Sequence, residues 1–135
     1  MRIVIDTNQL LTCFSAKSTT HWLWQAYKAK SFDLCVTTEI LNEYAEIFEL
    51  KYSFEAAELV NEIILESSNT VLITEYYHWN LITIDPDDNK FVDCALMANA
   101  DFIITHDRHF KVLKKIPFPS VKVIPLSKFK EILKL

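Results

Sequence analysis

The chain has 135 residues, half of them hydrophobic, and a formal net charge of −4, so it is large enough to bury a core as a single domain over residues 1–135. It contains no glycine, which excludes the glycine-rich loops that cradle nucleotide phosphates. No apolar run approaches the ~18 residues of a membrane span, and no signal peptide is evident. The cysteines are odd in number and lie in apolar segments, which indicates free thiols. We therefore expect a cytoplasmic protein without a membrane partner.

Short apolar segments alternate with amphipathic segments along the chain. The apolar segments lack an alternation of polar and apolar residues, which is typical of strands buried on both faces of a parallel sheet. We therefore predict an α/β fold with a five-stranded parallel sheet and helices on both faces. The predicted elements are a strand at 2–5, a helix at 18–30, a strand at 32–37, helices at 37–50 and 53–67, a strand at 70–74, a helix at 85–100, a strand at 101–107, a short helix at 108–116, a strand at 121–126 and a helix at 127–135.

Residue types mark several helix ends. Thr37 or Thr38, and Ser53, stand where hydroxyl side chains cap the starts of helices. Because no glycine is available, Asn99 is expected to take the left-handed conformation that ends a helix.

Acids follow two of the predicted strands directly. Asp6 ends the first strand and Asp107 ends the fourth. In an open parallel sheet, ligands bind beyond the carboxyl ends of the strands, at the point where the strand order reverses. These two carboxylates therefore mark a candidate site, and two unrelated surface-turn aspartates are the competing interpretation.

Other acids lie in the predicted helices. Asp93 has largely apolar neighbours, which predicts burial and hence a partner, either Lys90 or a metal ion. Asp88 lies on a different side of the same helix and is interpreted as its cap, with a supporting role at the site. Glu43 lies on the acidic side of its helix, where periodicity alone favours a solvated surface.

Carboxylates that converge without cysteine or histidine favour a hard divalent cation with oxygen ligands, Mg²⁺ or Mn²⁺. Such ions polarise the oxygens of a phosphodiester and lower the pKa of a bound water molecule. This chemistry points to a phosphodiester substrate.

Positive charge is concentrated near the C-terminus. Residues 108–135 hold eight Lys and Arg residues against one acid, Glu131. This asymmetry is a weak indication of contact with nucleic acid or a charged protein, and charge runs alone favour a solvated basic helix surface.

Four segments together resemble a known family. IDTN (5–8), LNEY (41–44), DDNKFVDCALMANADFIITHD (87–107) and RHF (108–110) resemble the PIN domain, and they are most similar to the VapC-like ribonucleases of bacterial toxin–antitoxin pairs. The resemblance implies a three-layer fold, a Mg²⁺- or Mn²⁺-dependent endoribonuclease, an RNA substrate, a homodimer and an antitoxin partner.

The resemblance also implies roles for individual residues. By position, the catalytic and metal-binding acids are Asp6, Glu43, Asp93 and Asp107. Thr105 would orient a ligand through its hydroxyl group, and Thr7 and Asn8 match the polar residues after the first acid. Lys90, His106 and Arg108 are candidate contacts with the substrate.

Two positions depart from the family pattern. His109 stands where many of these toxins have an aspartate, and His106 stands where a glycine is common. The first change puts the occupancy of a second metal site in doubt. The second places a side chain at the edge where substrate would enter.

We therefore predict a metal-dependent endoribonuclease that is the toxin of a toxin–antitoxin pair. The alternatives are a non-catalytic RNA- or protein-binding module, an RNA-processing nuclease outside such pairs, and a phosphoacceptor domain with Asp6 as nucleophile. The phosphoacceptor interpretation lacks the lysine that it needs at a neighbouring strand end. The aromatic run YYHW at 76–79 is a candidate subunit interface.

Overall fold

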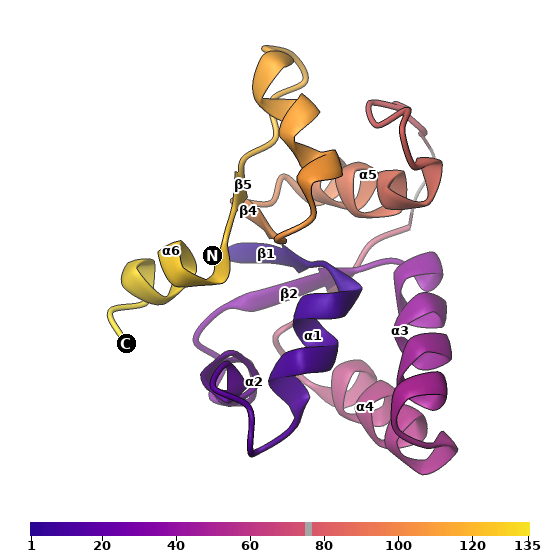
Figure 1. The fold of residues 1–135 in the computed structure, drawn as a ribbon, viewed down its shortest axis with the longest axis vertical. Helices are drawn as coiled ribbons and strands as arrows, with labels where there is room; N and C mark the ends of the chain where they lie inside the picture. Colours follow the sequence, from indigo (N-terminus) through magenta and orange to yellow (C-terminus); the bar gives the residue numbers. More distant parts are fainter. Residues whose placement is uncertain (75–76) are drawn as a thin grey trace.

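The structure is a computed structural model that describes residues 1–74 and 77–135 (Figure 1). Its strands are β1 (Arg2–Ile5), β2 (Asp33–Val36), β3 (Thr70–Leu72), β4 (Phe102–Ile104) and β5 (Val123–Ile124). Its helices are α1 (Thr7–Phe14), α2 (His21–Lys28), α3 (Thr38–Lys51), α4 (Phe54–Glu66), α5 (Asn89–Ala98) and α6 (Leu126–Ile132), with 3₁₀ helices η1 (Pro86–Asp88) and η2 (Arg108–Lys115). The order of elements agrees with the prediction, except that α1 was not predicted.

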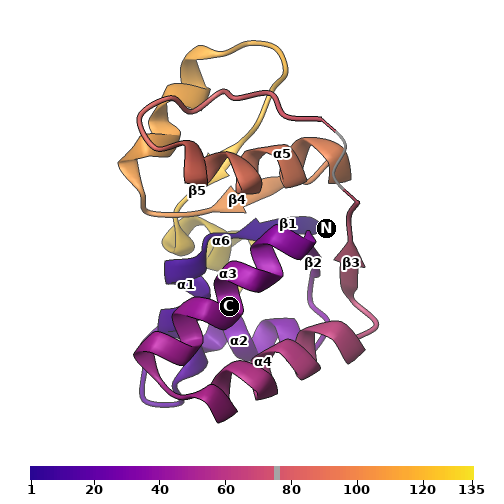
Figure 2. The same cartoon turned by 90° about the vertical axis from the view of Figure 1, so that its right-hand side faces the viewer.

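The five strands form one parallel sheet in the order β3-β2-β1-β4-β5. Helix α5 covers one face of the sheet and α1, α2, α3 and α4 gather on the other (Figure 2). The predicted α/β fold with helices on both faces is therefore confirmed. The strand order reverses between β1 and β4, so their carboxyl ends define the switch point at which such sheets bind ligands.

Helix α1 begins immediately after β1, with no intervening loop. The backbone oxygen of Asp6 accepts hydrogen bonds from the amides of Gln9 and Leu10, at 3.0 and 3.2 Å. The Asp6 side chain makes no capping hydrogen bond to the helix. The polar residues after the strand are thus the first turn of a helix, and the Asp6 carboxylate remains available for other contacts.

The helix ends follow the residue types predicted for them. Thr37 Oγ1 accepts from the amide of Ile40, and Ser53 Oγ accepts from the amide of Ala56. Asn99 ends α5 with a positive φ of 52°. Hydroxyl and Asn side chains therefore perform the local roles expected from the sequence.

The core is apolar and contains the three cysteines as free, buried thiols, as predicted. Burial raises the pKa of the Cys13 thiol to about 12 and that of Cys35 to about 11, so both stay protonated at neutral pH. Across the described residues, no helix has the length and apolar character needed to cross a membrane.

Part of the candidate aromatic interface is described. Tyr77 and Trp79 pack edge to face, with 4.7 Å between ring centroids, and Tyr77 is exposed. Tyr76 lies outside the described residues. The role of this run as a subunit interface stays a prediction.

Candidate metal centre

The switch point brings together the two acids that follow β1 and β4. Ile5 pairs with Ile104 in the parallel ladder, so the next residues, Asp6 and Thr105, lie side by side. Thr105 Oγ1 donates to Asp6 Oδ2 at 2.7 Å and accepts from the amide of Asp107 at 3.0 Å. One hydroxyl group thus bonds both the Asp6 carboxylate and the backbone of Asp107, and the orienting role of Thr105 stays a prediction.

Glu43 reaches this site from α3 on the neighbouring side of β1. The adjacent Tyr44 is fully buried and its hydroxyl donates to the backbone oxygen of Ile5, which holds α3 against the strand end. Thr7 Oγ1 donates to one carboxylate oxygen of Glu43, and Lys90 Nζ lies 2.7 Å from the other. Glu43 is therefore not the solvated surface residue that periodicity alone favours.

Lys90 does not pair with Asp93, the partner considered for it from the sequence. Its ammonium group pairs with Glu43, and the Lys90 side chain is only 15% exposed. Burial tends to lower the pKa of Lys90, but the hydrogen bond and charge of Glu43 outweigh it, so the pKa is raised. Lys90 is thus held as a cation beside Glu43.

Asp88 lies at the start of α5, but its side chain does not cap the helix. Instead its carboxylate lies 3.2 Å from Nδ1 of His109, and the side chain is 13% exposed. His109 in turn donates its backbone amide to Asp107 at 2.9 Å. Asp88 therefore occupies the N-cap position of α5, as predicted, but its carboxylate is directed to His109 and not to the helix backbone.

Asp93 has partners outside the group of acids at the strand ends. It accepts from the amide of Trp79 at 3.2 Å, lies 3.3 Å from His78 Nδ1, and its side chain is 2% exposed. It lines a small polar pocket with Glu39, His78 and Lys90. Burial of Asp93 was predicted correctly, but within the described residues no hydrogen bond or ion pair joins it to Asp6 or Asp107, and its partner is not Lys90.

Burial and like charge act together on the clustered acids. Burial raises the pKa of Asp6, and the charges of Asp107 and Glu43 raise it further against the hydrogen bond from Thr105. Burial likewise raises the pKa of Asp88 to about 6, where the hydrogen bond from His109 opposes it and the charges of Asp107, Asp85 and Asp6 reinforce it. The cluster therefore resists carrying its full negative charge without a cation.

The donor set fits a divalent metal ion. In the part of the chain that the structure describes, no Lys or Arg pairs with Asp6, Asp88 or Asp107. Both oxygens of Glu43, by contrast, are already engaged by Thr7 and Lys90. Three carboxylates at the switch point thus lack a strong cationic partner, and their oxygen atoms suit Mg²⁺ or Mn²⁺.

Residues 2–109, which contain all these acids, match the family model described as the PIN domain. The chain belongs to the PIN domain family. The fold agrees with VapBC2 from Rickettsia felis, solved bound to a DNA fragment from its promoter, with a TM-score of 0.64, 17% identity, and coverage of 93% of this chain and 98% of that one. It also agrees with VapBC-1 from nontypeable Haemophilus influenzae, with a TM-score of 0.59, 13% identity, and coverage of 94% and 99%. No curated protein sequence matches this one significantly.

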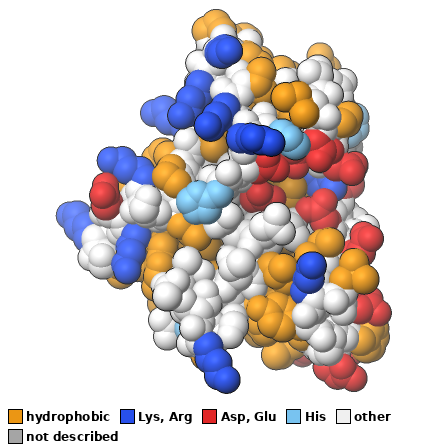
Figure 3. All heavy atoms as spheres, viewed as in Figure 1, with side chains coloured by type: hydrophobic (Ala, Val, Ile, Leu, Met, Phe, Trp, Pro, Cys, Tyr) orange, Lys and Arg blue, Asp and Glu red, His pale blue; other side chains and the backbone are white. Residues whose placement is uncertain are grey.

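The remaining predicted residues lie around the acids of this PIN domain. Asn8, His106 and Arg108 are exposed. His106 and Arg108 flank Asp107, and Asn8 lies two residues after Asp6. Figure 3 shows Lys and Arg side chains gathered over the upper left of the molecule, with histidine and then acidic side chains beside them. Helix η2, which carries Arg108, Lys111, Lys114 and Lys115, follows Asp107 directly, so the start of the basic segment at 108–135 lies beside the clustered acids.

Proposed function

We propose that this PIN domain is a Mg²⁺- or Mn²⁺-dependent endoribonuclease. The observation that carries the proposal is the convergence of Asp6, Asp88 and Asp107 at the switch point of the sheet, with Glu43 beside them. In this proposal Asp88 takes the place that the sequence assigned to Asp93, because Asp88 contacts the cluster through His109 and Asp93 does not.

Each residue has a defined task in the proposed reaction. A bound divalent ion would supply charge stabilisation at the phosphoryl oxygens and lower the pKa of the attacking water. Asp6, Asp88 and Asp107 would hold the ion, and Thr105 would keep the Asp6 carboxylate in position. Lys90 would neutralise Glu43 and so limit repulsion of the RNA backbone.

We also propose that the protein acts as the toxin of a toxin–antitoxin pair, as a homodimer with an antitoxin partner. The similarity of four sequence segments to VapC-like ribonucleases and the fold shared with two VapBC proteins support this proposal. Co-expression with the protein encoded next to it tests it directly. An antitoxin should form a stable complex and abolish RNA cleavage, whereas a processing nuclease should show neither effect.

The test of the nuclease function is RNA cleavage by the purified protein with and without metal. We expect cleavage of single-stranded RNA in Mg²⁺ or Mn²⁺, complete loss in excess EDTA, and recovery when the ion is restored. Cleavage that persists in EDTA would contradict the proposed mechanism. RNA binding without cleavage in either ion would instead identify a non-catalytic module.

The basic surface beside the acids makes a separate prediction about RNA binding. Replacing Lys111, Lys114 and Lys115 by Gln should weaken binding and reduce the slope of log K against log salt by roughly 0.7 per lost phosphate contact, about 2 in all. Fluorescence anisotropy of labelled RNA at several salt concentrations measures this slope.

The matched control replaces three exposed lysines outside this surface, at positions 17, 28 and 51, by Gln. It removes the same charge, so a general loss of electrostatic attraction would lower both slopes equally. If the first triple variant keeps the wild-type slope, these lysines do not contact phosphates.

A further inference from the structure

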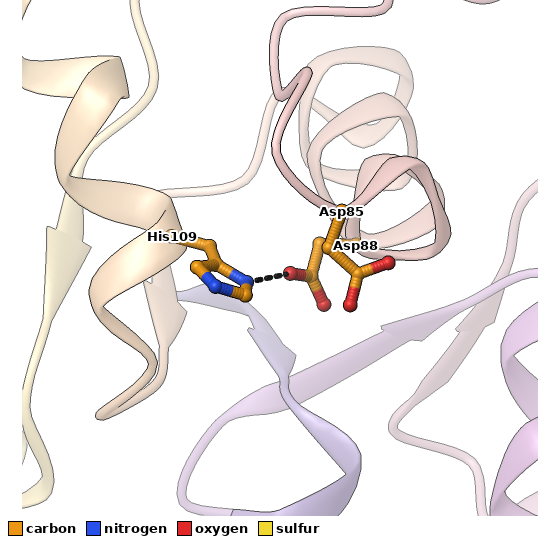
Figure 4. A group of neighbouring side chains, drawn as sticks. All are labelled: Asp85, Asp88 and His109. Atoms are coloured by element: carbon orange, nitrogen blue, oxygen red, sulfur yellow. Dashed lines mark hydrogen bonds and ion pairs between the residues drawn. The ribbon is translucent and has the colours of Figure 1, made fainter.

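A mixed cluster of ligating atoms lies next to the three acids. Asp85 precedes η1, Asp88 ends it and His109 lies in η2, and one ligand atom from each falls within 4.8 Å of the others. Figure 4 shows the two carboxylates side by side, facing the imidazole ring across the space between the two segments. All three side chains are partly buried. Segments more than twenty residues apart thus converge on one small volume.

Backbone contacts hold these side chains in place. Asp85 Oδ1 accepts from the amide of Asp87 at 3.2 Å, which orients the carboxylate and leaves its second oxygen available. The amide of His109 donates to Asp107, and the ring nitrogen Nδ1 lies 3.2 Å from Asp88 and 3.5 Å from Asp107. The imidazole nitrogen therefore faces two carboxylates of the proposed metal centre.

The chemistry of this cluster differs from that of an all-carboxylate site. An imidazole nitrogen is a poor ligand for Mg²⁺, which prefers oxygen, and a good one for transition metals such as Mn²⁺ and those that follow it in the affinity series. Asp85 and Asp88 supply oxygen ligands that suit Mn²⁺. At the position where many VapC-like toxins have an aspartate, this chain thus carries an imidazole, which offers nitrogen in place of oxygen.

We infer that Asp85, Asp88 and His109 form a cation subsite with one nitrogen ligand, which takes Mn²⁺ in preference to Mg²⁺. The subsite shares Asp88 with the centre made by Asp6 and Asp107, so the inference rests on the proposed function. It specifies the metal class and adds two ligands that the similarity to the family does not assign.

Electron paramagnetic resonance of bound Mn²⁺ tests the nitrogen ligand directly. The full-length protein is loaded with Mn²⁺ alone, and electron spin echo modulation detects coupling to a directly bound ¹⁴N nucleus. We expect this coupling in the wild-type protein, its replacement by ¹⁵N coupling after labelling with ¹⁵N-histidine, and its loss in His109→Gln. The matched control His106→Gln should keep it, because His106 is exposed and lies outside the cluster.

Affinities measured by titration calorimetry supply an independent result. In the wild type, Mn²⁺ should bind more tightly than Mg²⁺. His109→Gln should raise the Kd for Mn²⁺ about tenfold and should change the Kd for Mg²⁺ much less. Tenfold is the lower end of the usual loss of affinity when a group supporting a metal site is removed. Asp85→Asn should weaken Mn²⁺ binding as well.

The possible outcomes separate this inference from the proposed function. Mn²⁺ that binds and supports cleavage without nitrogen coupling, and with equal affinities for both ions, would overturn the subsite and leave the nuclease intact. His109 would then act only as a hydrogen-bond partner of Asp88. A wild-type protein that binds neither ion would overturn both proposals.

Discussion

Replacing Asp88 by Asn should lower metal-dependent RNA cleavage by about 100-fold or more, the order of loss seen when one group that stabilises a transition state is removed. Replacing Asp93 by Asn should cost less than about tenfold, or 1.4 kcal/mol. The reason is geometric: Asp88 contacts the acids at the strand ends through His109, whereas Asp93 accepts from Trp79 and His78 on another side of α5.

The measurement is the initial rate of cleavage of one RNA by both variants, at equal concentration and saturating Mn²⁺ or Mg²⁺. Asp6→Asn serves as the reference for a lost ligand, because Asp6 directly follows β1 and the charges of both Asp107 and Glu43 act on it. Circular dichroism must show that all three variants are folded. If Asp93→Asn loses as much activity as Asp6→Asn while Asp88→Asn stays active, the ligand set inferred from sequence position holds and the geometric argument fails.

The second prediction concerns the stability of the metal-free protein. In EDTA at pH 7.5, Asp88→Asn should melt about 3–5 °C above the wild type, the shift that about 1 kcal/mol produces in a domain of this size. The folded protein holds Asp88 with a pKa of about 6, against an ordinary value of 3.8, because burial and neighbouring carboxylates disfavour its charged form. The side chain is 13% exposed, so solvent screens part of this penalty.

The pH dependence follows from the direction of the shift. A carboxyl group with a raised folded-state pKa stabilises the fold fully below its unfolded pKa, near 4, and this contribution is lost as the pH rises through about 6. The difference in Tm between Asp88→Asn and the wild type should therefore be largest above pH 7 and vanish near pH 4. Scanning calorimetry across this range, in EDTA, measures it.

Metal binding provides the control for this stability prediction. Millimolar Mg²⁺ or Mn²⁺ should raise the Tm of the wild type, because the ion binds only the folded state, and should raise that of Asp88→Asn much less. Asp93→Asn should keep the full increase. A Tm difference that is constant with pH, or a variant that melts below the wild type at pH 7.5, would show that the Asp88 charge is satisfied in the metal-free fold.

Apart from α1, the sequence by itself determined the order of the strands and helices, and it identified two of the acids at the site. An apolar run without polar alternation can be stable only where both of its faces are covered, and this requirement is local enough to be recognised in the chain. An acid directly after such a run lies at the carboxyl end of its strand, and parallel strands bring these ends to one edge. Asp6 and Asp107 were therefore predictable, and the structure joins them through Thr105.

Helix α1 was not predicted, because its polar first turn resembles a loop when judged by composition alone. Its apolar contacts come from the buried Leu10 and Cys13 and from the partly buried Leu11 and Phe14, but eight residues are too short a stretch to show a clear periodicity. The direction in which the polar residues after β1 point was therefore not predicted either. Only the direct passage from strand to helix turns the polar group of residues 6–8 toward the switch point.

Only the tertiary structure decided whether Asp88, at the N-cap of α5, or Asp93, within α5, faces the site. Helical geometry separates Asp88 and Asp93 by about 140°, but periodicity does not say which of them points toward the ends of β1 and β4. That choice depends on how α5 lies across the sheet and on the loop before it, which brings the amide of Trp79 to Asp93. A buried carboxylate can be satisfied by backbone amides as well as by a cation, so burial alone could not identify the ligand.

The same reason applies to Glu43 and His109. Their side chains have ordinary surroundings in the sequence, and both acquire their roles from residues far along the chain: Lys90 and Thr7 for Glu43, Asp88 for His109. Hydrogen bonds and ion pairs between distant segments depend on the packing of whole elements, which no local pattern encodes. The acids that end strands were thus determined by the sequence, and their partners by the packing of α3, α5 and η2 around the sheet.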